Sequence, residues 1–337
     1  MESNAQKGLA DSMKELRMGI IMDPIENINI DKDTTFVIML EAQKRGHKLF
    51  YLEMGDLFIR SSVPYGASRP VRVVRGKPHF ELGPRESRPL DWFDTVLMRK
   101  DPPFDLYFFF ATHLLSLVDT KQCVVINDPH GLREATEKLY GLNFPEIIPP
   151  SIVSGDIQRL KDFMEEQGGE IIVKPLEGCG GSGVLYLHKN DRNINAILEL
   201  VTANGRIPVM GQRYLPEVRQ GDKRVLVLNG EPIGAMLRVP QENDNRANIH
   251  VGGSSVPAEI TPRDLEICRV LSEPLKRLGL YFVGLDVIGG FLTEVNVTSP
   301  TCVQEIDAFN KVNLEADIVD FIERKVGSTK GLPTHEH

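Results

Sequence analysis

The most constraining feature of the sequence is a glycine-rich stretch at residues 174–187, which read KPLEGCGGSGVLYL. Gly178, Gly180 and Gly183 form the pattern G-x-G-x-x-G. In a Rossmann unit these glycines open a helix, whose N-terminus then binds a pyrophosphate. Here the following residues, VLYLHK, alternate in polarity and are typical of a strand. The strand–loop–strand context excludes the Rossmann fingerprint, and the chain contains no G-x-x-x-x-G-K-[ST] pattern of P-loop NTPases.

A glycine loop between two antiparallel strands is instead typical of a flap. Its small residues let backbone N–H groups approach phosphates without obstruction by side chains. Lys174 lies in an apolar strand just before the loop, and a buried ammonium needs a partner. A nucleotide phosphate is one candidate, and the alternative is a plain hairpin turn with a surface lysine. The loop alone leaves both interpretations open.

A second segment, residues 282–300, carries three oxygen-bearing side chains on an otherwise apolar hairpin and reads FVGLDVIGGFLTEVNVTSP. Glu294 and Asn296 are two residues apart and therefore share one strand face. Asp286 lies on the preceding strand. Two carboxylates and an amide oxygen suit a hard cation such as Mg²⁺ bound together with phosphates. On a buried face these groups would repel one another unless a cation lay between them.

The register of this hairpin decides whether the three side chains meet. If Ile288 pairs with Leu292, Asp286 lies directly opposite Glu294. A strict two-residue turn at residues 289–290 would place the two carboxylates on opposite faces. We therefore predict a three-residue loop or a β-bulge in this hairpin.

The overall composition is that of a globular protein with two or three packed units, since 41% of its 337 residues are hydrophobic. The net charge of −8 argues against wholesale binding to nucleic acid. We expect neither a signal peptide nor an anchor in the polar N-terminus, and no run is long enough to span a membrane. The cysteines at 123, 179, 268 and 302 form no C-x-x-C pair, so reduced thiols in a cytosolic protein are expected.

Residues 18–140 alternate strand and helix signals, which predicts a mostly parallel sheet covered on both faces. Asp33 and Gly46 are the expected N-cap and stop of the first helix. The run LYFFFATHLLSLV (106–118) predicts a buried helix. Residues 60–90, rich in Pro, Gly and Arg, are expected to form a solvated excursion with an exposed hairpin built from VRVV and HFEL.

The second half of the chain begins after a linker near residues 145–150, PEIIPP. A helix, the glycine-loop strands, a second helix and the strand IPVMGQRYL follow. Two strands then flank the turn Asn229-Gly230, and a long polar loop covers 240–254. We expect helices at about 261–279 and 312–325 on either side of the D…E-x-N hairpin.

Together, the flap, Lys174 and the D…E-x-N set resemble the ATP-grasp superfamily, in which two α/β lobes hold ATP. Further segments resemble bacterial-type glutathione synthetase: MDPIENINIDKDTTF (22–36), LMRKDPPFD (97–105), QRYLP (212–216), GDKRVLVLNGEP (221–232) and TEVNVTSPTC (293–302). The similarity runs from about Met18 to Val326 and includes N-terminal motifs that generic ATP-grasp ligases lack. It covers residues 60–90 and both chain ends poorly.

The resemblance implies an α/β ATP-grasp fold, with an N-terminal doubly wound parallel-sheet domain and two α+β lobes that enclose ATP. The expected divisions are a polar N-terminal extension (1–17), the N-terminal α/β domain (18–140), a central ATP-grasp lid subdomain (141–215), a C-terminal ATP-grasp subdomain with the metal site and substrate loop (216–326) and a tail (327–337).

The activity implied is the ATP-dependent ligation of γ-glutamylcysteine and glycine through an acyl phosphate, which gives glutathione, ADP and phosphate. The implied metal is Mg²⁺, or Mn²⁺ in its place. A cytoplasmic homo-oligomer, tetramer or dimer, without nucleic-acid or membrane partners is expected. One alternative is another ATP-grasp carboxylate–amine ligase, of the D-Ala–D-Ala or glutamate type, which the N-terminal motifs argue against. The other is a nucleotide-binding regulator without catalysis, which would be expected to lack Arg224 or part of the metal set.

The resemblance also assigns roles to individual residues. Arg224 and Arg238 would stabilise charge on the acyl phosphate and on the tetrahedral intermediate. The implied nucleotide-binding residues are Lys138, Lys174, Gly178, Gly180, Gly181, Ser182 and Gly183 at the phosphates, Gln212, Arg213, Tyr214 and Leu215 at the adenine, and Asp222 at the ribose. The implied peptide site contains Arg99, Asn296, Ser299, Pro300 and Thr301, and the metal ligands are Asp286, Glu294 and Asn296.

Two further expectations concern mobile or reactive positions. Residues 240–254 resemble the family's lid, which would close over a water-sensitive intermediate. Cys179 stands in the glycine loop where the family usually has another residue, such as methionine. It is either a site of inactivating thiol alkylation, with Cys302 as the rival target, or an inert turn residue.

Overall fold

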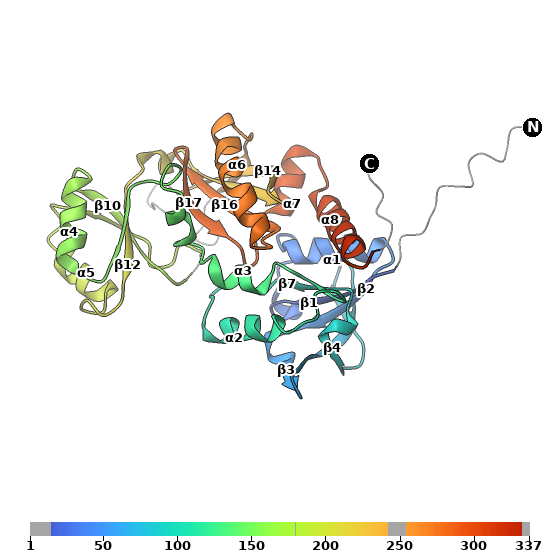
Figure 1. Ribbon diagram of the computed structural model, residues 1–337. Helices are drawn as coiled ribbons and strands as arrows, with labels where there is room; N and C mark the ends of the chain where they lie inside the picture. Colours follow the sequence, from blue (N-terminus) through green and yellow to red (C-terminus); the bar gives the residue numbers. More distant parts are fainter. Residues whose placement is uncertain (1–14, 179, 242–253, 332–337) are drawn as a thin grey trace, which may run out of the picture.

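The computed structural model describes residues 15–178, 180–241 and 254–331, which form three β-sheets with helices packed against them (Figure 1). The first sheet is built from the N-terminal part of the chain, the second from its middle and the third from its C-terminal part. Short 3₁₀ turns join the regular elements: η1 (Ile25–Asn27), η2 (Met54–Asp56), η3 (Leu90–Trp92), η4 (Tyr140–Asn143) and η5 (Pro216–Arg219). Within these described ranges no helix has the length and apolar character needed to cross a bilayer.

The first sheet has a parallel centre in the order β2-β1-β7-β8. Its parallel strands are β1 (Arg17–Ile21), β2 (Lys48–Leu52), β7 (Thr95–Met98) and β8 (Val124–Ile126), and its helices are α1 (Thr34–Lys44), α2 (Leu106–Leu115) and α3 (Pro129–Glu134). The strands are almost continuously apolar, since the side chains on both faces of this sheet are buried. This confirms the alternating strand and helix pattern expected for residues 18–140.

The helix caps of this unit follow the sequence signals. The Asp33 side chain accepts a hydrogen bond of 2.6 Å from the Phe36 N–H and so caps α1. Gly46 follows the helix with a φ of +89°, a value that favours glycine. The prediction of a buried helix at 106–118 is only half right, because one face of α2 is open to solvent. Leu106 is 72% exposed and Phe110 is 56% exposed.

Residues 60–90 are more tightly joined to the sheet than expected. They contribute to β3 (Leu57–Arg60), β4 (Val63–Val73), β5 (Phe80–Leu82) and β6 (Glu86–Pro89). The predicted hairpin of VRVV and HFEL is present, since Val71 pairs with Leu82. The expectation of a solvated excursion is wrong for β4, which pairs antiparallel with β2 and buries alternate side chains. At the end of β4, Val71 and Val73 are buried and Arg72 between them is exposed, the alternation typical of a half-buried strand.

The second sheet is antiparallel, in the order β11-β10-β12-β9. It consists of β9 (Ser151–Ser154), β10 (Glu170–Pro175), β11 (Leu185–His188) and β12 (Val209–Arg213), packed against α4 (Ile157–Glu166) and α5 (Ile194–Val201). Its side chains form a separate hydrophobic core around Leu160, Ile171 and Val209. Figure 1 shows this unit projecting away from the rest of the molecule. The short strand β9 was not predicted.

The third sheet has the order β15-β14-β13-β16-β17 and is antiparallel. Its strands are β13 (Asp222–Leu228), β14 (Glu231–Val239), β15 (Ser254–Pro257), β16 (Phe282–Ile288) and β17 (Phe291–Asn296), and its helices are α6 (Pro262–Arg277), α7 (Val303–Asn310) and α8 (Leu314–Thr329). The predicted turn at Asn229-Gly230 is confirmed, with positive φ at both residues. The elements β15 and α7 were missed because each is short.

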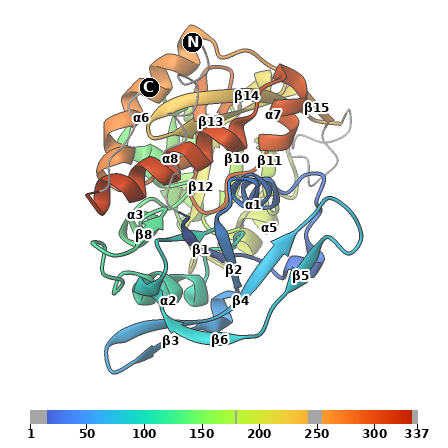
Figure 2. The same cartoon turned by 90° about the vertical axis from the view of Figure 1, so that its right-hand side faces the viewer.

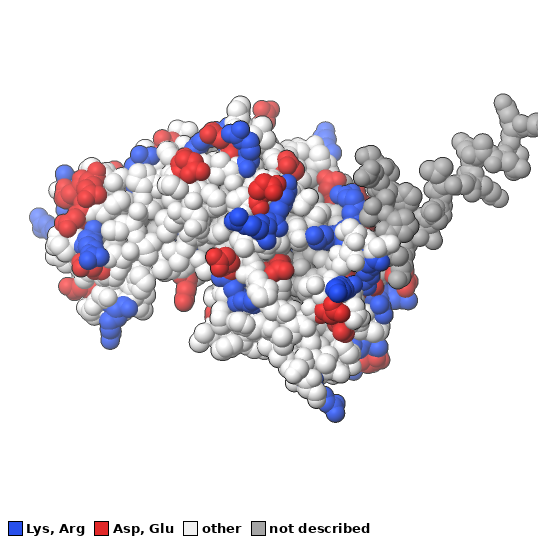
Figure 3. Space-filling view, viewed as in Figure 1, with Lys and Arg blue, Asp and Glu red and all other residues white. Residues whose placement is uncertain are grey.

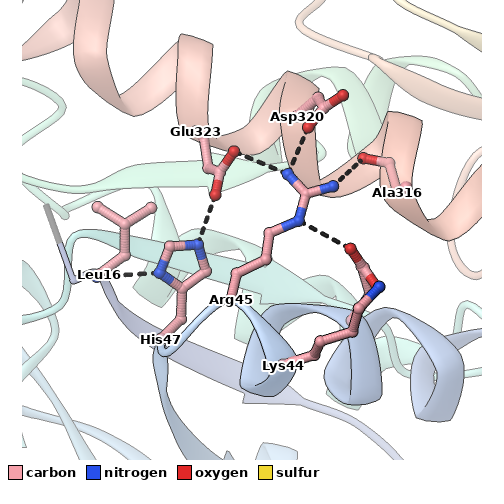
Figure 4. Close-up of polar contacts among 8 residues, drawn as sticks. Leu16, Lys44, Arg45, His47, Ala316, Asp320 and Glu323 are labelled. Carbon is pink, nitrogen blue, oxygen red and sulfur yellow. Dashed lines mark hydrogen bonds and ion pairs between the residues drawn. The ribbon is translucent and has the colours of Figure 1, made fainter. Parts of the chain in front are cut away.

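The closing helix α8 joins the third unit to the first. Figure 2 shows α8 beside α1, and Figure 4 shows the polar contacts between them. Arg45 at the end of α1 binds Glu41 at 2.9 Å, Glu323 at 2.9 Å and also Asp320. His47 shares Glu323, with a distance of 2.8 Å from Nε2 to Oε1. Two hydrophobic cores span both units, so the first and third sheets form one packed body.

Candidate active site

A pocket of about 120 Å³ lies between the second and third sheets. One wall is apolar and consists of Ile172, Val184, Leu215, Val218 and Ile288. The remaining lining is polar and includes Lys174, Asp222, Asp286 and Glu294. An apolar slot that ends in charged groups suits a flat ring carrying an ionic tail. Sequence reasoning found the charged residues but missed Ile172, Val184, Val218 and Ile288, whose apolar side chains resemble ordinary core residues.

The glycine loop has the predicted strand–loop–strand context, because β10 and β11 pair antiparallel. Gly178, Gly180, Gly181 and Gly183 all have positive φ, between +67° and +94°. A Cβ on Gly183 would lie 2.8 Å from Pro175 Cγ, so a side chain there would force a shift. The backbone of this loop therefore depends on glycine, and it borders the pocket at Gly181.

Two lysines from different units lie near the glycine loop, and Lys174 also lines the pocket. Lys174 is buried on β10, and its Nζ donates to the Thr293 carbonyl oxygen at 3.3 Å. Burial lowers the pKa of Lys174, although the Glu294 carboxylate opposes that shift. Lys138 is also buried, and its Nζ donates to the Gly178 carbonyl oxygen at 2.7 Å. At these contacts each ammonium group is bound by a neutral carbonyl oxygen and not by an anion. Both positive charges are therefore suited to an anionic ligand.

Residues 212–215, at the end of β12 and directly after it, line the pocket, and three of their side chains contact neighbouring groups. Gln212 is buried, and its Nε2 donates to Ser151 Oγ at 2.9 Å. The Arg213 guanidinium lies 5.0 Å from the ring centroid of Phe291. The Tyr214 ring lies 4.7 Å from that of Tyr186. These contacts fix the segment at the pocket, where Leu215 adds to the apolar wall.

The β16–β17 hairpin contains the predicted irregularity. Asp286 pairs with Glu294, and the register shifts between Asp286 and Val287. The assumed pairing of Ile288 with Leu292 is wrong, because Ile288 pairs with Phe291 across a two-residue turn. A bulge then restores the shared face of the two carboxylates, so the prediction of a bulge is confirmed.

Asp286 is the centre of a buried ion-pair cluster. Its Oδ1 accepts from Arg224 Nε at 2.6 Å, and its Oδ2 accepts from Arg224 Nη2 at 3.1 Å. Arg238 Nη2 lies 2.9 Å from the same Oδ2. Burial would raise the pKa of Asp286, but the guanidinium groups of Arg224 and Arg238 outweigh it and hold that pKa below its ordinary value. The guanidinium groups of Arg224 and Arg238 therefore supply the positive charge that the Asp286 carboxylate needs on this face.

Asp222 joins the same cluster. Its Oδ2 lies 2.5 Å from Arg238 Nη2, whereas its buried Oδ1 has no hydrogen-bond partner among the described residues. Arg238 Nε is likewise buried and without a partner in that part of the chain. Burial raises the pKa of Asp222 to about 7, against the opposing charge of Arg238. Of these two residues Asp222 lines the pocket, and an unpartnered polar atom there indicates a place for a polar ligand.

Glu294 and Asn296 differ from Asp286 in how they are held. No hydrogen bond or ion pair joins the Glu294 carboxylate to another described residue. The Asn296 amide donates to Asp286 Oδ2 at 3.2 Å, which leaves its oxygen for another contact. Nowhere in the described ranges do three or more His, Cys, Asp or Glu side chains form a metal-binding group. The hard oxygens of Glu294 and Asn296 nevertheless fit Mg²⁺, which keeps few protein ligands and shares substrate phosphates.

A second, larger cavity of about 530 Å³ lies beside residues 22–33 and the start of α7. Arg99 borders it and is buried, with Nε donating to Thr35 Oγ1 at 3.1 Å and Nη2 donating to the Pro300 carbonyl oxygen at 2.8 Å. Burial lowers the pKa of Arg99 to about 10. Arg99 and Thr301 line this cavity, whereas Ser299 and Pro300 do not, although Pro300 contacts Arg99.

Some predicted positions remain outside this description. Cys179 and residues 242–253 of the predicted lid (240–254) lie outside the described residues. Ser182 is exposed in the glycine loop. Cys302 is buried beside the larger cavity, and burial raises the pKa of its thiol. Figure 3 shows basic and acidic side chains interspersed on the viewed face.

Comparison with known proteins agrees with this geometry. The family model of the prokaryotic glutathione synthetase N-terminal domain matches residues 16–133, and that of its ATP-grasp domain matches residues 137–311. Glutathione synthetase of Thermosynechococcus vestitus is 45% identical over 315 residues, covering 90% of this chain and 99% of that protein. The enzyme of Shewanella oneidensis is 43% identical over 314 residues, covering 93% of this chain and 99% of that protein.

Solved structures support the same fold at lower sequence identity. The D-cycloserine synthetase DcsG is 15% identical, with a TM-score of 0.65 over 93% of this chain and 100% of the other. An ATP-grasp ligase associated with a ribosomal peptide in Chryseobacterium gregarium is 15% identical, with a TM-score of 0.61 over 96% and 99% of the two chains. The fold is therefore ATP-grasp, and the chain belongs to the prokaryotic glutathione synthetase family.

Proposed function

We propose that this chain joins γ-glutamylcysteine to glycine at the expense of ATP and releases glutathione, ADP and phosphate. The observation that carries the proposal is the arginine–carboxylate cluster of Arg224, Asp286 and Arg238. It borders the apolar pocket through Asp286 and approaches the larger cavity through Cys302, whose thiol lies within electrostatic range of both arginines. A nucleotide and a dipeptide bound in these two spaces would meet at this cluster.

The smaller pocket would bind ATP. Its apolar wall would hold the adenine against the backbone of residues 212–215, with Asp222 toward the ribose. Lys138 and Lys174 would pair with the phosphates, and the glycine loop (178–183) would cover them through backbone N–H groups. Glu294 and Asn296 would hold the metal, with Asp286 in support. When bound, Mg²⁺, or Mn²⁺ in its place, would neutralise negative charge on the phosphates.

The reaction begins when an oxygen of the cysteinyl carboxylate attacks the γ-phosphorus of ATP, and ADP departs. The amine of glycine then attacks the carbonyl carbon of the acyl phosphate. The tetrahedral intermediate collapses, and phosphate leaves with the oxygen that came from the carboxylate. Arg224 and Arg238 face negative charge that grows in both steps, and Asp286 keeps their planar groups in a fixed orientation.

The larger cavity would bind the dipeptide, with Arg99 and Thr301 in its wall, Ser299 and Pro300 next to Thr301 in the chain, and Asn296 near the reacting end. Residues 240–254 would exclude water from the acyl phosphate. The separate core of the second sheet supports the proposed division into the N-terminal domain (18–140), the central lid subdomain (141–215) and the C-terminal subdomain (216–326). It would let the central unit move as one body when ligands bind.

Oligomeric state and location are finer parts of the proposal. A tetramer or dimer of this chain, acting on small molecules without nucleic acid or membrane, agrees with the family assignment and the net charge of −8. Cys123, Cys268 and Cys302 are free thiols, which agrees with the reducing cytoplasm.

The direct test is ADP release with substrates omitted one at a time. Purified protein with Mg-ATP should release ADP only when γ-glutamylcysteine and glycine are both present, and mass spectrometry should identify glutathione. D-Alanine alone, or glutamate in place of the dipeptide, should give only background. Equal turnover with D-alanine alone would instead favour the D-Ala–D-Ala ligase alternative.

A further inference from the structure

One acidic residue at the larger cavity has a buried carboxylate oxygen without a hydrogen-bond partner among the described residues. Asp23 at the cavity wall is bound to Lys100, with Oδ1 2.8 Å from Nζ. Asp33 is engaged as the N-cap of α1. Glu305 differs from both, because its Oε2 is buried and accepts no hydrogen bond from any described residue. A buried carboxylate oxygen without a donor is costly unless a ligand supplies one.

A charge of the opposite sign faces the same part of the cavity. Glu305 lies in the first turn of α7, and Lys32 lies in the loop before α1. Burial raises the pKa of Glu305, and the Lys32 ammonium is near enough to oppose that shift. The two side chains nevertheless form no ion pair with each other. The wall of the cavity therefore contains a carboxylate and an ammonium that are not paired with each other.

We propose that Glu305 binds the α-ammonium of the γ-glutamyl group, and that Lys32 faces the α-carboxylate on the same carbon. This assignment rests on the proposed function. The γ-linkage leaves a free amino-acid head with one charge of each sign, and this pair of side chains is complementary to both. An α-linked Glu-Cys would carry its ammonium and its free carboxylate on different carbons and would not match them.

The position of Glu305 also sets the direction of the dipeptide. Cys302, one helical turn earlier, is within electrostatic range of Arg224 and Arg238. The cysteinyl carboxylate must reach these arginines to be phosphorylated. The γ-glutamyl head therefore points away from them, along α7 toward Glu305.

The neighbouring side chain holds this arrangement in place. Gln304 Nε2 donates to the carbonyl oxygens of Ile30 at 3.1 Å and Asp33 at 2.8 Å, which flank Lys32. Its Oε1 accepts from Arg75 Nη2 at 3.0 Å, so the β4–β5 hairpin joins the same network. The first turn of α7 and the loop of Lys32 are thus fixed to each other before a ligand arrives.

The test compares γ-glutamylcysteine with glutarylcysteine, which is identical except that it lacks the α-amino group. A charge-assisted hydrogen bond predicts that the wild-type protein prefers γ-glutamylcysteine roughly 10- to 100-fold in kcat/KM. Glu305→Gln should lose most of this preference through a higher KM for γ-glutamylcysteine, with the kinetics of glutarylcysteine and the KM for ATP unchanged. The control Glu273→Gln removes the same charge from an exposed site on α6 and should keep the preference.

The outcomes separate this assignment from the proposed function. If the wild-type protein uses γ-glutamylcysteine and glutarylcysteine equally, or if Glu305→Gln keeps the preference, the role proposed for Glu305 is wrong while the ligase activity stands. The proposed role is also overturned if Glu305→Gln lowers kcat/KM for γ-glutamylcysteine and for glutarylcysteine to the same extent. If the wild-type protein makes no glutathione, the proposed function and this assignment fail together. Because the first comparison uses the wild-type protein alone, it does not depend on the folding of the variant.

Discussion

Replacing Asp286 with asparagine should destabilise the protein far more than its single lost charge suggests. Asp286 accepts hydrogen bonds from Arg224 at 2.6 and 3.1 Å and lies 2.9 Å from Arg238. An asparagine side chain at this position would offer one neutral oxygen and turn an N–H group toward a guanidinium. Breaking a buried ion pair by removing one partner costs about 3–5 kcal/mol. Since Arg238 keeps Asp222, we expect the lower end of this range.

Thermal melting of the ligand-free protein at pH 7 measures this effect. A loss of about 3 kcal/mol corresponds to a fall in Tm of roughly 6–12 °C, given about 2–4 °C per kcal/mol for large domains. The matched control is Glu294→Gln, which removes the same charge from the same sheet face without breaking an ion pair. We expect its Tm to stay within about 2 °C of the wild type, although its turnover should fall by orders of magnitude. A Tm for Asp286→Asn no lower than that of Glu294→Gln would refute this reasoning.

The pH dependence gives the same prediction a second check. The folded-state pKa of Asp286 lies below its unfolded value of about 3.9. Its contribution to stability is therefore fully present above the unfolded pKa and is lost as the pH falls through the folded pKa. The difference in Tm between the wild type and Asp286→Asn should persist from about pH 5 to 8 and disappear only in strongly acidic solution. It should narrow as the pH rises past about 7, because the Asp286 charge helps to raise the pKa of Asp222 to about 7 and repels the ionised Asp222 carboxylate. A difference that already disappears at pH 6 would contradict the ion-pair assignment.

Three further substitutions test other parts of the site. Gly183→Ala should raise the KM for ATP about tenfold. Left-handed strain of about 1–2 kcal/mol and the contact with Pro175 would distort the loop. The control Gly168→Ala, also at positive φ but outside the loop, should lower Tm and leave the KM for ATP unchanged. Lys174→Met should keep its Tm, since it removes a buried ammonium held by one carbonyl oxygen, but it should weaken ATP binding in calorimetry. Arg75→Ala should raise the KM for γ-glutamylcysteine and spare the KM for ATP, whereas the exposed Arg72→Ala on the same hairpin should change neither. A rise in the KM for ATP with Arg75→Ala would show a general structural effect instead.

Local sequence signals predicted much of the fold. Asp33 and Gly46 mark the start and the end of the first helix. They could be predicted because a side-chain cap and a glycine in the left-handed conformation both act within a few residues. The bulge in the D…E-x-N hairpin followed from the two-residue period of strands, since Asp286 and Glu294 must share a face. The burial of α2 was misjudged because its apolar residues occur all around the helix, so periodicity could not identify the exposed side.

The candidate site shows where sequence reasoning reaches its limit. Single side chains such as Lys174 and Arg99 were found from motifs, but their partners come from distant segments. Arg224 lies opposite Asp286 only because β13 pairs with β16, a contact between residues far apart in the sequence. Glu305 follows the last recognisable motif, and only the folded structure shows that its Oε2 lacks a hydrogen-bond partner. Polar pairing across strands depends on register and topology, which residue patterns alone do not specify.

The central claim is that the cysteinyl carboxylate is activated as an acyl phosphate beside Arg224 and Arg238. It is tested most directly with γ-glutamylcysteine that carries ¹⁸O in both oxygens of its cysteinyl carboxylate. Turnover with ATP and glycine in ordinary water should transfer one labelled oxygen to inorganic phosphate for each glutathione formed, and the other should remain in the new amide. Unlabelled phosphate accompanying labelled glutathione would contradict the account, because it would mean that the carboxylate oxygen never attacked the γ-phosphorus.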